Sequence, residues 1–203
     1  MKNRLSALLS AVVLAALAEG SALAAGADTG DLAIQARVEE AGAVSQVFLK
    51  QLGMAMKQEM QAGGPVAAVQ VCRDKAPAIA SELSLQKGWR VTRVGTRVRN
   101  PLLGTPDAWE QGVLKTFEKR AAQGEKYDSM THFEVVEEPD GKSLRYMKPI
   151  AVAPQCLMCH GSQDEIVAPV RQQLKSMYPH DRAVAYRPGD LRGAVSIKQP
   201  LMD

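Results

Sequence analysis

The sequence contains few aromatic residues, few histidines and few cysteines. Its 203 residues include two Trp, four Tyr, three Phe, three His and three Cys. Nine aromatic side chains supply little flat apolar surface for a core of this size, which indicates that another group contributes such surface. An odd number of cysteines at low density argues against a disulfide-stapled scaffold, because such scaffolds use even numbers of cysteines in short chains.

An excess of charge of one sign is also missing. The chain has 25 basic and 22 acidic residues, a net charge of +3, and no basic run or stripe. We therefore expect no nucleic-acid partner. With 46% hydrophobic and 23% charged residues, the composition excludes a disordered tail, a collagen-like fibre and a polytopic membrane protein. The length favours a single domain.

Residues 1–24 have the features of a secretory signal peptide. Lys2 and Arg4 precede an apolar run over residues 5–17, and a small-residue cleavage site follows at residues 22–24. The apolar run is shorter than the roughly 20 residues of a membrane helix, which disfavours an uncleaved anchor. We therefore expect a mature domain over residues 25–203 that is soluble in the periplasm and makes no membrane contact after cleavage.

The remaining pattern predicts an α+β fold. Apolar residues at helical spacing predict helices over residues 31–61 and 66–87, separated by a break at Gly63-Gly64-Pro65. Pro77 predicts a kink or break just after Cys72. A strand is expected over 89–94, and a helix capped by Thr105 runs to about residue 123. A hairpin over 131–137 and 143–150, a helix over 164–177 and a last strand over 191–197 complete an α+β domain.

Cys156-Leu157-Met158-Cys159-His160 forms the motif C-x-x-C-H, the attachment sequence of c-type haem. Two thiols three positions apart on a helical turn can each bond a haem vinyl group, and the adjacent imidazole can then bind the iron. Export supports this interpretation, because such attachment occurs outside the cytoplasm in bacteria. We expect one covalent haem c held by Cys156, Cys159 and the proximal ligand His160.

Three other uses of these cysteines are open. Cys156 and Cys159 could form a redox-active thiol pair, although no βαβ pattern precedes them. The same two residues could form a structural disulfide. Together with Cys72 and His160 they also have the ligand types and number of a zinc site. A zinc-binding or thiol–disulfide protein would be colourless, whereas a haem protein would not.

Several further motifs surround the C-x-x-C-H sequence in a fixed order. They are Val71-Cys72-Arg73, Gly88-Trp89-Arg90-Val91, Arg99-Asn100-Pro101, Pro106-Asp107, Tyr146-Met147-Lys148-Pro149-Ile150, and Tyr186 with Gly189-Asp190-Leu191-Arg192-Gly193. In these motifs most of the mature chain resembles a family of single-haem c-type domains, found alone and as sensory modules of bacterial signalling proteins. The resemblance implies a PAS-like antiparallel sheet with N-terminal helices. It also implies an unusual cysteine as the second axial haem ligand, at the position of Cys72.

The residues themselves also point to Cys72. It is the one cysteine outside the C-x-x-C-H motif, it lies on an apolar helix stripe, and its neighbours Arg73 and Lys75 favour a thiolate. A small buried cysteine without function is the alternative. Rival ligands for the sixth iron position are His132, His180 and methionines such as Met147.

Cationic side chains near these motifs are candidates to bind the haem propionates, because a partly buried carboxylate needs a cationic partner. The candidates are Arg97, Arg99, Arg145 and Lys148. Trp109 is a candidate to pack on the porphyrin.

The sequence thus predicts an exported monohaem c-type cytochrome with His160 and Cys72 as axial ligands. Its expected role is redox or small-ligand sensing, or one-electron transfer, with a redox partner protein or a small ligand as its partner. A displaceable thiolate favours sensing, whereas a rapid carrier keeps its ligands and exposes a haem edge. Because no catalytic group or substrate pocket is recognisable, we expect that the protein is not an enzyme.

Overall fold

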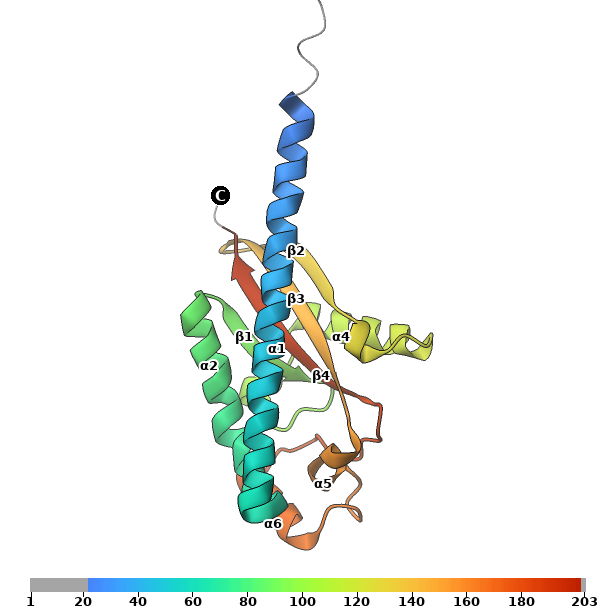
Figure 1. Ribbon diagram of the computed structural model, residues 1–203. Coiled ribbons are helices and arrows are strands. Elements are labelled where there is room, and N and C mark those ends of the chain that lie inside the picture. Colours follow the sequence, from blue (N-terminus) through green and yellow to red (C-terminus); the bar gives the residue numbers. More distant parts are fainter. Residues whose placement is uncertain (1–21, 202–203) are drawn as a thin grey trace, which may run out of the picture. The chain divides into compact units, whose positions relative to one another are not determined.

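The computed structural model describes residues 22–201 (Figure 1). Most of the expected signal peptide, residues 1–21, lies outside the described residues. By its internal contacts the chain divides into two units, Met1–Gln35 and Ala36–Asp203, and the architecture below is that of the second unit. Of the helices in residues 22–201, none is both long enough and apolar enough to cross a membrane.

Four antiparallel strands form the central sheet, in the order β1-β4-β3-β2 (Figure 1). The strands are β1 Arg90–Gly95, β2 His132–Glu138, β3 Gly141–Ala151 and β4 Leu191–Pro200. The hairpin expected from Pro139-Asp140-Gly141 is confirmed, since β2 pairs with β3 across this turn. The first strand, β1, pairs with the last strand, β4, so the sheet joins distant parts of the sequence. The expected α+β class is confirmed.

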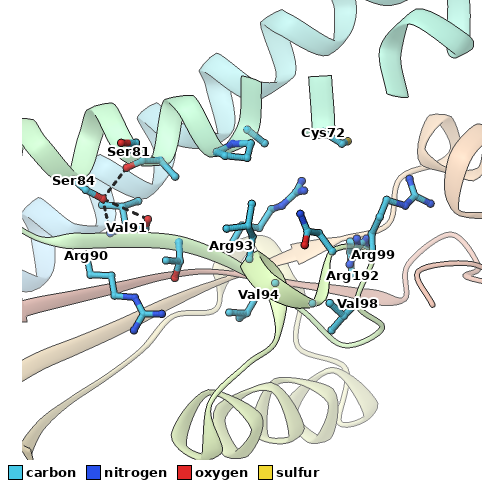
Figure 2. Close-up of a pocket in the computed structure, with 18 of the residues that line it drawn as sticks. Cys72, Ser81, Ser84, Arg90, Val91, Arg93, Val94, Val98, Arg99 and Arg192 are labelled. Carbon is cyan, nitrogen blue, oxygen red and sulfur yellow. Dashed lines mark hydrogen bonds between the residues drawn. The ribbon is translucent and has the colours of Figure 1, made fainter. Parts of the chain in front are cut away.

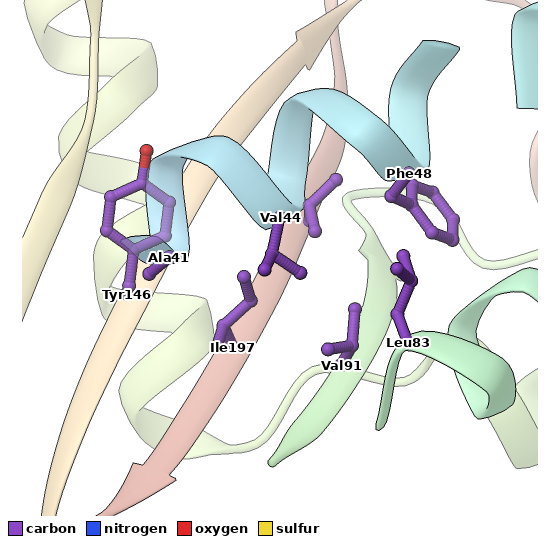
Figure 3. Packing of buried hydrophobic residues seen from close by; sticks show 8 residues of the cluster. Ala41, Val44, Phe48, Leu83, Val91, Tyr146 and Ile197 are labelled. Atoms are coloured by element: carbon purple, nitrogen blue, oxygen red, sulfur yellow. The ribbon is translucent and has the colours of Figure 1, made fainter. Parts of the chain in front are cut away.

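Helices α1 (Ala22–Gln70) and α2 (Ala76–Lys87) supply the apolar side chains that cover one face of the sheet. Ala41, Val44 and Phe48 recur at spacings of three and four residues, so they share one side of α1. This side packs on Ile197 of β4 and on Leu83 of α2 (Figure 3). The resulting cluster fixes the helices over the sheet.

Both helix breaks expected from the sequence are confirmed. Gly64 has φ 69° and ψ −164°, which interrupts the helical geometry within α1 directly before Pro65. The segment η1 (Val71–Lys75) is one turn of π-helix, and the Ala76 N–H donates to the Val71 carbonyl. Pro77 explains this wider turn, because it has no N–H to donate and its ring crowds the preceding turn. The irregular turn carries Cys72.

The opposite face of the sheet is covered by α4 (Ala108–Ala122), through buried Val113, Leu114 and Phe117. The expected cap at Thr105 is wrong. Asp107 is the N-cap, and it forms a reciprocal capping box with Glu110. Thr105 instead ends the short helix α3 (Pro101–Gly104) and donates its hydroxyl to the Pro101 carbonyl.

Strands β1 and β4 approach each other closely at two glycines. A Cβ atom on Gly193, where φ is 151°, would overlap the carbonyl oxygen of Val94. A Cβ atom on the facing Gly95 would lie 2.8 Å from Nη1 of Arg192. At Gly193 only glycine allows the close approach of the two strands, and at Gly95 the missing Cβ leaves room for the Arg192 side chain.

The segments after β3 are short. Helices η3 (Pro154–Cys156) and α5 (Leu157–His160) carry the C-x-x-C-H motif, and α6 spans Ala168–Met177. The helix expected to begin at residue 164 therefore begins four residues later. Residues 162–165 form a turn instead, in which Ser162 N donates to the Glu165 carboxylate over 2.7 Å. The short helix η2 (Tyr127–Ser129) precedes β2.

Candidate functional site

The C-x-x-C-H motif lies on consecutive helical turns, η3 and α5, as the spacing predicts. Cys156, Cys159 and Cys72 are free thiols in the structure. Nδ1 of His160 lies 2.6 Å from the carbonyl oxygen of Ala183, so this nitrogen is the proton donor. The opposite nitrogen, Nε2, therefore keeps its lone pair and is the atom able to bind a metal.

The surroundings of His160 favour the neutral imidazole. Burial, reinforced by the positive charge of Arg99, holds the pKa of His160 well below its ordinary value. A neutral ring with Nδ1 protonated is the form that binds iron through Nε2. The ring of Tyr186 packs edge-on against the His160 ring, with the ring centres 6.0 Å apart, and this limits its rotation.

Arg99 ties the motif to the loop that follows β1. Its Nη2 donates to the Cys159 carbonyl over 2.5 Å, and its Nε pairs with the Asp181 carboxylate at 2.9 Å. Asp181 in turn accepts the N–H of Ala183, the residue whose carbonyl orients His160. Burial of Arg99 at 6% exposure keeps these bonds from competing water. One arginine thus positions both His160 and the motif cysteine Cys159.

Tyr186 adds a second connection between the same segments. Its N–H donates to the His160 carbonyl over 2.9 Å, and its hydroxyl accepts the Arg97 N–H and lies 2.9 Å from the Thr96 hydroxyl. The guanidinium of Arg97 stacks 4.1 Å above its ring centre. These contacts hold the motif close to the end of β1.

A pocket of about 350 Å³ opens between β1, the η1 and α2 turns, and the loop after β1 (Figure 2). Its volume falls in the range of small-molecule and cofactor sites, about 300–1,000 Å³. The wall combines apolar residues with arginines: Ala76, Pro77, Val91, Val94, Val98 and Leu103 beside Arg90, Arg93, Arg99 and Arg192. Cys72 and Tyr178 complete one side of it.

Cys72 is the cysteine that faces this pocket (Figure 2). It shares the pocket wall with Arg99, which hydrogen-bonds to the Cys159 carbonyl. Burial raises the pKa of the Cys159 thiol above its ordinary value. Tyr178 lies in the same pocket wall as Cys72. Burial, and to a smaller extent the negative charge of a Cys72 thiolate, raises the pKa of Tyr178 to about 12. The sequence suggested that Arg73 would favour a Cys72 thiolate. Arg73 instead pairs with the Asp74 carboxylate at 2.8 Å.

The other proposed iron ligands lie elsewhere. His132 hydrogen-bonds to Glu134 over 2.9 Å on β2, and Met147 belongs to the buried cluster under α4. His180 is exposed and is not part of the pocket wall. Within residues 22–201, no three His, Cys, Asp or Glu side chains come close enough together to bind one metal ion, so the four proposed zinc ligands are not gathered into a site.

Two of the three arginines proposed from sequence do not line the pocket. Arg97 donates to the carbonyls of Val184 and Ala185. Arg145 is buried under α4, where it pairs with Asp107 at 2.6 Å and stacks on Trp109. Trp109 therefore also lies on the far face of the sheet, and Lys148 is bound to the carbonyls of Asp128 and Met130. Only Arg99 of these candidates reaches the pocket.

Arg93 and Arg192 line the pocket but were not singled out from sequence. Arg93 occupies the same face of β1 as Val91, which is the face toward α2. Arg192 lies next to Leu191 at the start of β4. A charged residue among the apolar residues at the start of a strand was the available signal, because cations are rarely buried without a partner.

These features define an α+β domain in which one pocket combines a free cysteine with several arginines. Cys156, Cys159 and His160 are not in the lining of this pocket, and the connection to them is Arg99, which lines the pocket and hydrogen-bonds to the Cys159 carbonyl. A family model described as Tll0287-like matches residues 30–200. The chain belongs to the Tll0287-like family.

A solved structure has the same fold. It is described as the crystal structure of the cyanobacterial heme-protein Tll0287, with a TM-score of 0.60 and 24% sequence identity. The alignment covers 81% of this chain and 96% of that one. Among curated proteins, no significant match was found.

Proposed function

We propose that this chain is a haem protein that binds one haem c covalently through Cys156 and Cys159. The observation that carries this proposal is the His160 geometry, with Nδ1 hydrogen-bonded to Ala183 at 2.6 Å and Nε2 left as the ligating atom. Membership of the Tll0287-like family and the fold shared with a heme-protein support it. When bound, a haem iron supplies one-electron redox chemistry and a site for small ligands.

The residues of the pocket fit such a group. The apolar side chains on β1 and α2 offer surface to a porphyrin, and the arginines offer partners to carboxylates. Nη1 of Arg99 is buried and has no hydrogen-bond partner within residues 22–201, so this pocket-lining residue keeps one unused donor. We propose Cys72 as the second axial ligand, because it is the cysteine in the pocket wall.

Within this proposal the fold acts as a redox or small-ligand sensor, or as a one-electron carrier in the periplasm. Cys72 favours sensing. It sits on the π-turn η1, which departs from regular helix directly at the ligand and is a place where a helix can adjust. We propose no enzymatic activity, and the partner would be a redox protein or a small ligand.

Covalent attachment can be tested on a denaturing gel stained for haem, using protein from cells able to mature c-type cytochromes. The wild-type band should stain, because thioether bonds survive denaturation. Cys156→Ala combined with Cys159→Ala should abolish the stain. Met158→Ala, between the two cysteines and 38% exposed, is the matched control and should stain normally. An unstained wild-type band would refute the proposal.

A further inference from the structure

We propose that Arg93, Arg99 and Arg192 form one anion-binding site that receives the propionate groups of the haem; this inference rests on the proposed function. The three residues come from separate parts of the chain: β1, the loop after it, and β4. They meet in the wall of the pocket that contains Cys72 (Figure 2). The sequence-based candidates Arg97 and Arg145 are not part of this set.

The pocket wall carries an excess of positive charge. Its lining includes four arginines and, among the described residues, no aspartate or glutamate. Arg93 makes no ion pair with another residue of the described chain, and the side chain of Arg192 donates to the Arg97 carbonyl over 3.1 Å. Buried cations without counter-charges destabilise a fold, so an anion bound here would offset that cost.

The electrostatics of Arg192 agree with this picture. Burial, together with the nearby positive charge of Arg93, lowers the pKa of Arg192 to about 10. Arg99 adds a donor with no partner, since its Nη1 is buried while Nε and Nη2 are used by Asp181 and Cys159. Within residues 22–201, Arg93 and Arg192 therefore lack an acidic partner, whereas Arg99 pairs with Asp181 and keeps one unused donor.

Gly95 makes room for this arrangement. A Cβ atom there would lie 2.8 Å from Nη1 of Arg192 and 3.0 Å from the Arg97 carbonyl oxygen. The same carbonyl accepts the Arg192 hydrogen bond. An alanine at position 95 would thus displace the guanidinium without removing its charge.

Carboxylates are the anions that best match this site. A guanidinium presents parallel N–H donors that suit the two oxygens of a carboxylate. A haem brings two such carboxylates into the same pocket as its iron, which would account for three arginines lying near one cysteine. The site would then fix the haem orientation relative to Cys72.

The test uses holoprotein carrying Arg93→Gln or Arg192→Gln, with the exposed Arg182→Gln as a control for the loss of one charge. Haem stain should be retained in all three. Because removal of a nearby positive charge stabilises ferric iron, the ferric-to-ferrous ratio at a fixed potential should rise about tenfold in the two pocket variants. The propionate bending band in resonance Raman spectra should shift in both, and neither quantity should change in Arg182→Gln.

Gly95→Ala and Arg192→Lys provide variants that keep the charge. Both should shift the propionate band while changing the ferric-to-ferrous ratio less than Arg192→Gln. The proposal is overturned if haem-stained Arg93→Gln and Gly95→Ala proteins show the wild-type band and ratio, even where Arg192→Gln fails to fold. Failure of the wild-type protein to stain would instead reject the proposed function itself.

Discussion

Replacement of Cys72 by alanine should change the ferric absorption spectrum, raise the midpoint potential and open the sixth iron position to carbon monoxide or imidazole. A thiolate donates charge to iron and stabilises the ferric state, so its loss favours reduction. The free Cys72 thiol lies in the pocket wall together with Arg99, which hydrogen-bonds to the Cys159 carbonyl. Spectroelectrochemical titration and carbon monoxide difference spectra measure the three effects.

Met147→Leu is the matched control, because Met147 is fully buried in the cluster under α4 and is not part of the pocket wall. It should leave spectrum and potential unchanged. An unchanged Cys72→Ala spectrum would show that another residue is the ligand, and His132 and His180 would then be substituted in turn.

Removal of the haem should have the second large effect, a loss of stability and an increase in proteolysis. The sequence contains few aromatic residues, and the pocket arginines Arg93 and Arg192 would have no anionic partner within residues 22–201. We expect a melting temperature about 10 °C lower, which for a chain of this size corresponds to about 3 kcal/mol. Thermal melts and limited proteolysis of Cys156→Ala, Cys159→Ala protein measure it.

The holoprotein and the Met158→Ala variant serve as controls in the same melts. If haem-free protein unfolds with the same midpoint and cooperativity as holoprotein, haem does not contribute to the core. The low aromatic content would then have no connection with a cofactor.

Features encoded locally were predictable from sequence. Pro77 dictates the π-turn at η1 because a missing N–H acts within one helical turn. The strands and the hairpin followed from alternation and turn residues. The spacing of the C-x-x-C-H motif predicts that it lies on a helical turn, as it does in η3 and α5. The cap at Asp107 was missed because Thr105 and Asp107 are both good caps, and the capping box with Glu110 decides between them.

The sequence could not show which arginines line the pocket. Arg99 begins one motif and Arg145 directly precedes another. Arg99 contacts Cys159, 60 positions away, whereas Arg145 contacts Asp107 on the other face of the sheet. Such long-range pairing depends on how β1 and β4 meet. The Arg192 side chain lies against Gly95 of the paired strand β1, a contact that is visible only in the folded chain.

The intact mass of the purified protein under denaturing conditions tests the central claim most directly. Covalent haem c predicts the mass of the mature chain from Ala25 plus one haem, and this mass should persist after organic extraction. A mass equal to the polypeptide alone, from cells that mature c-type cytochromes, would contradict the account.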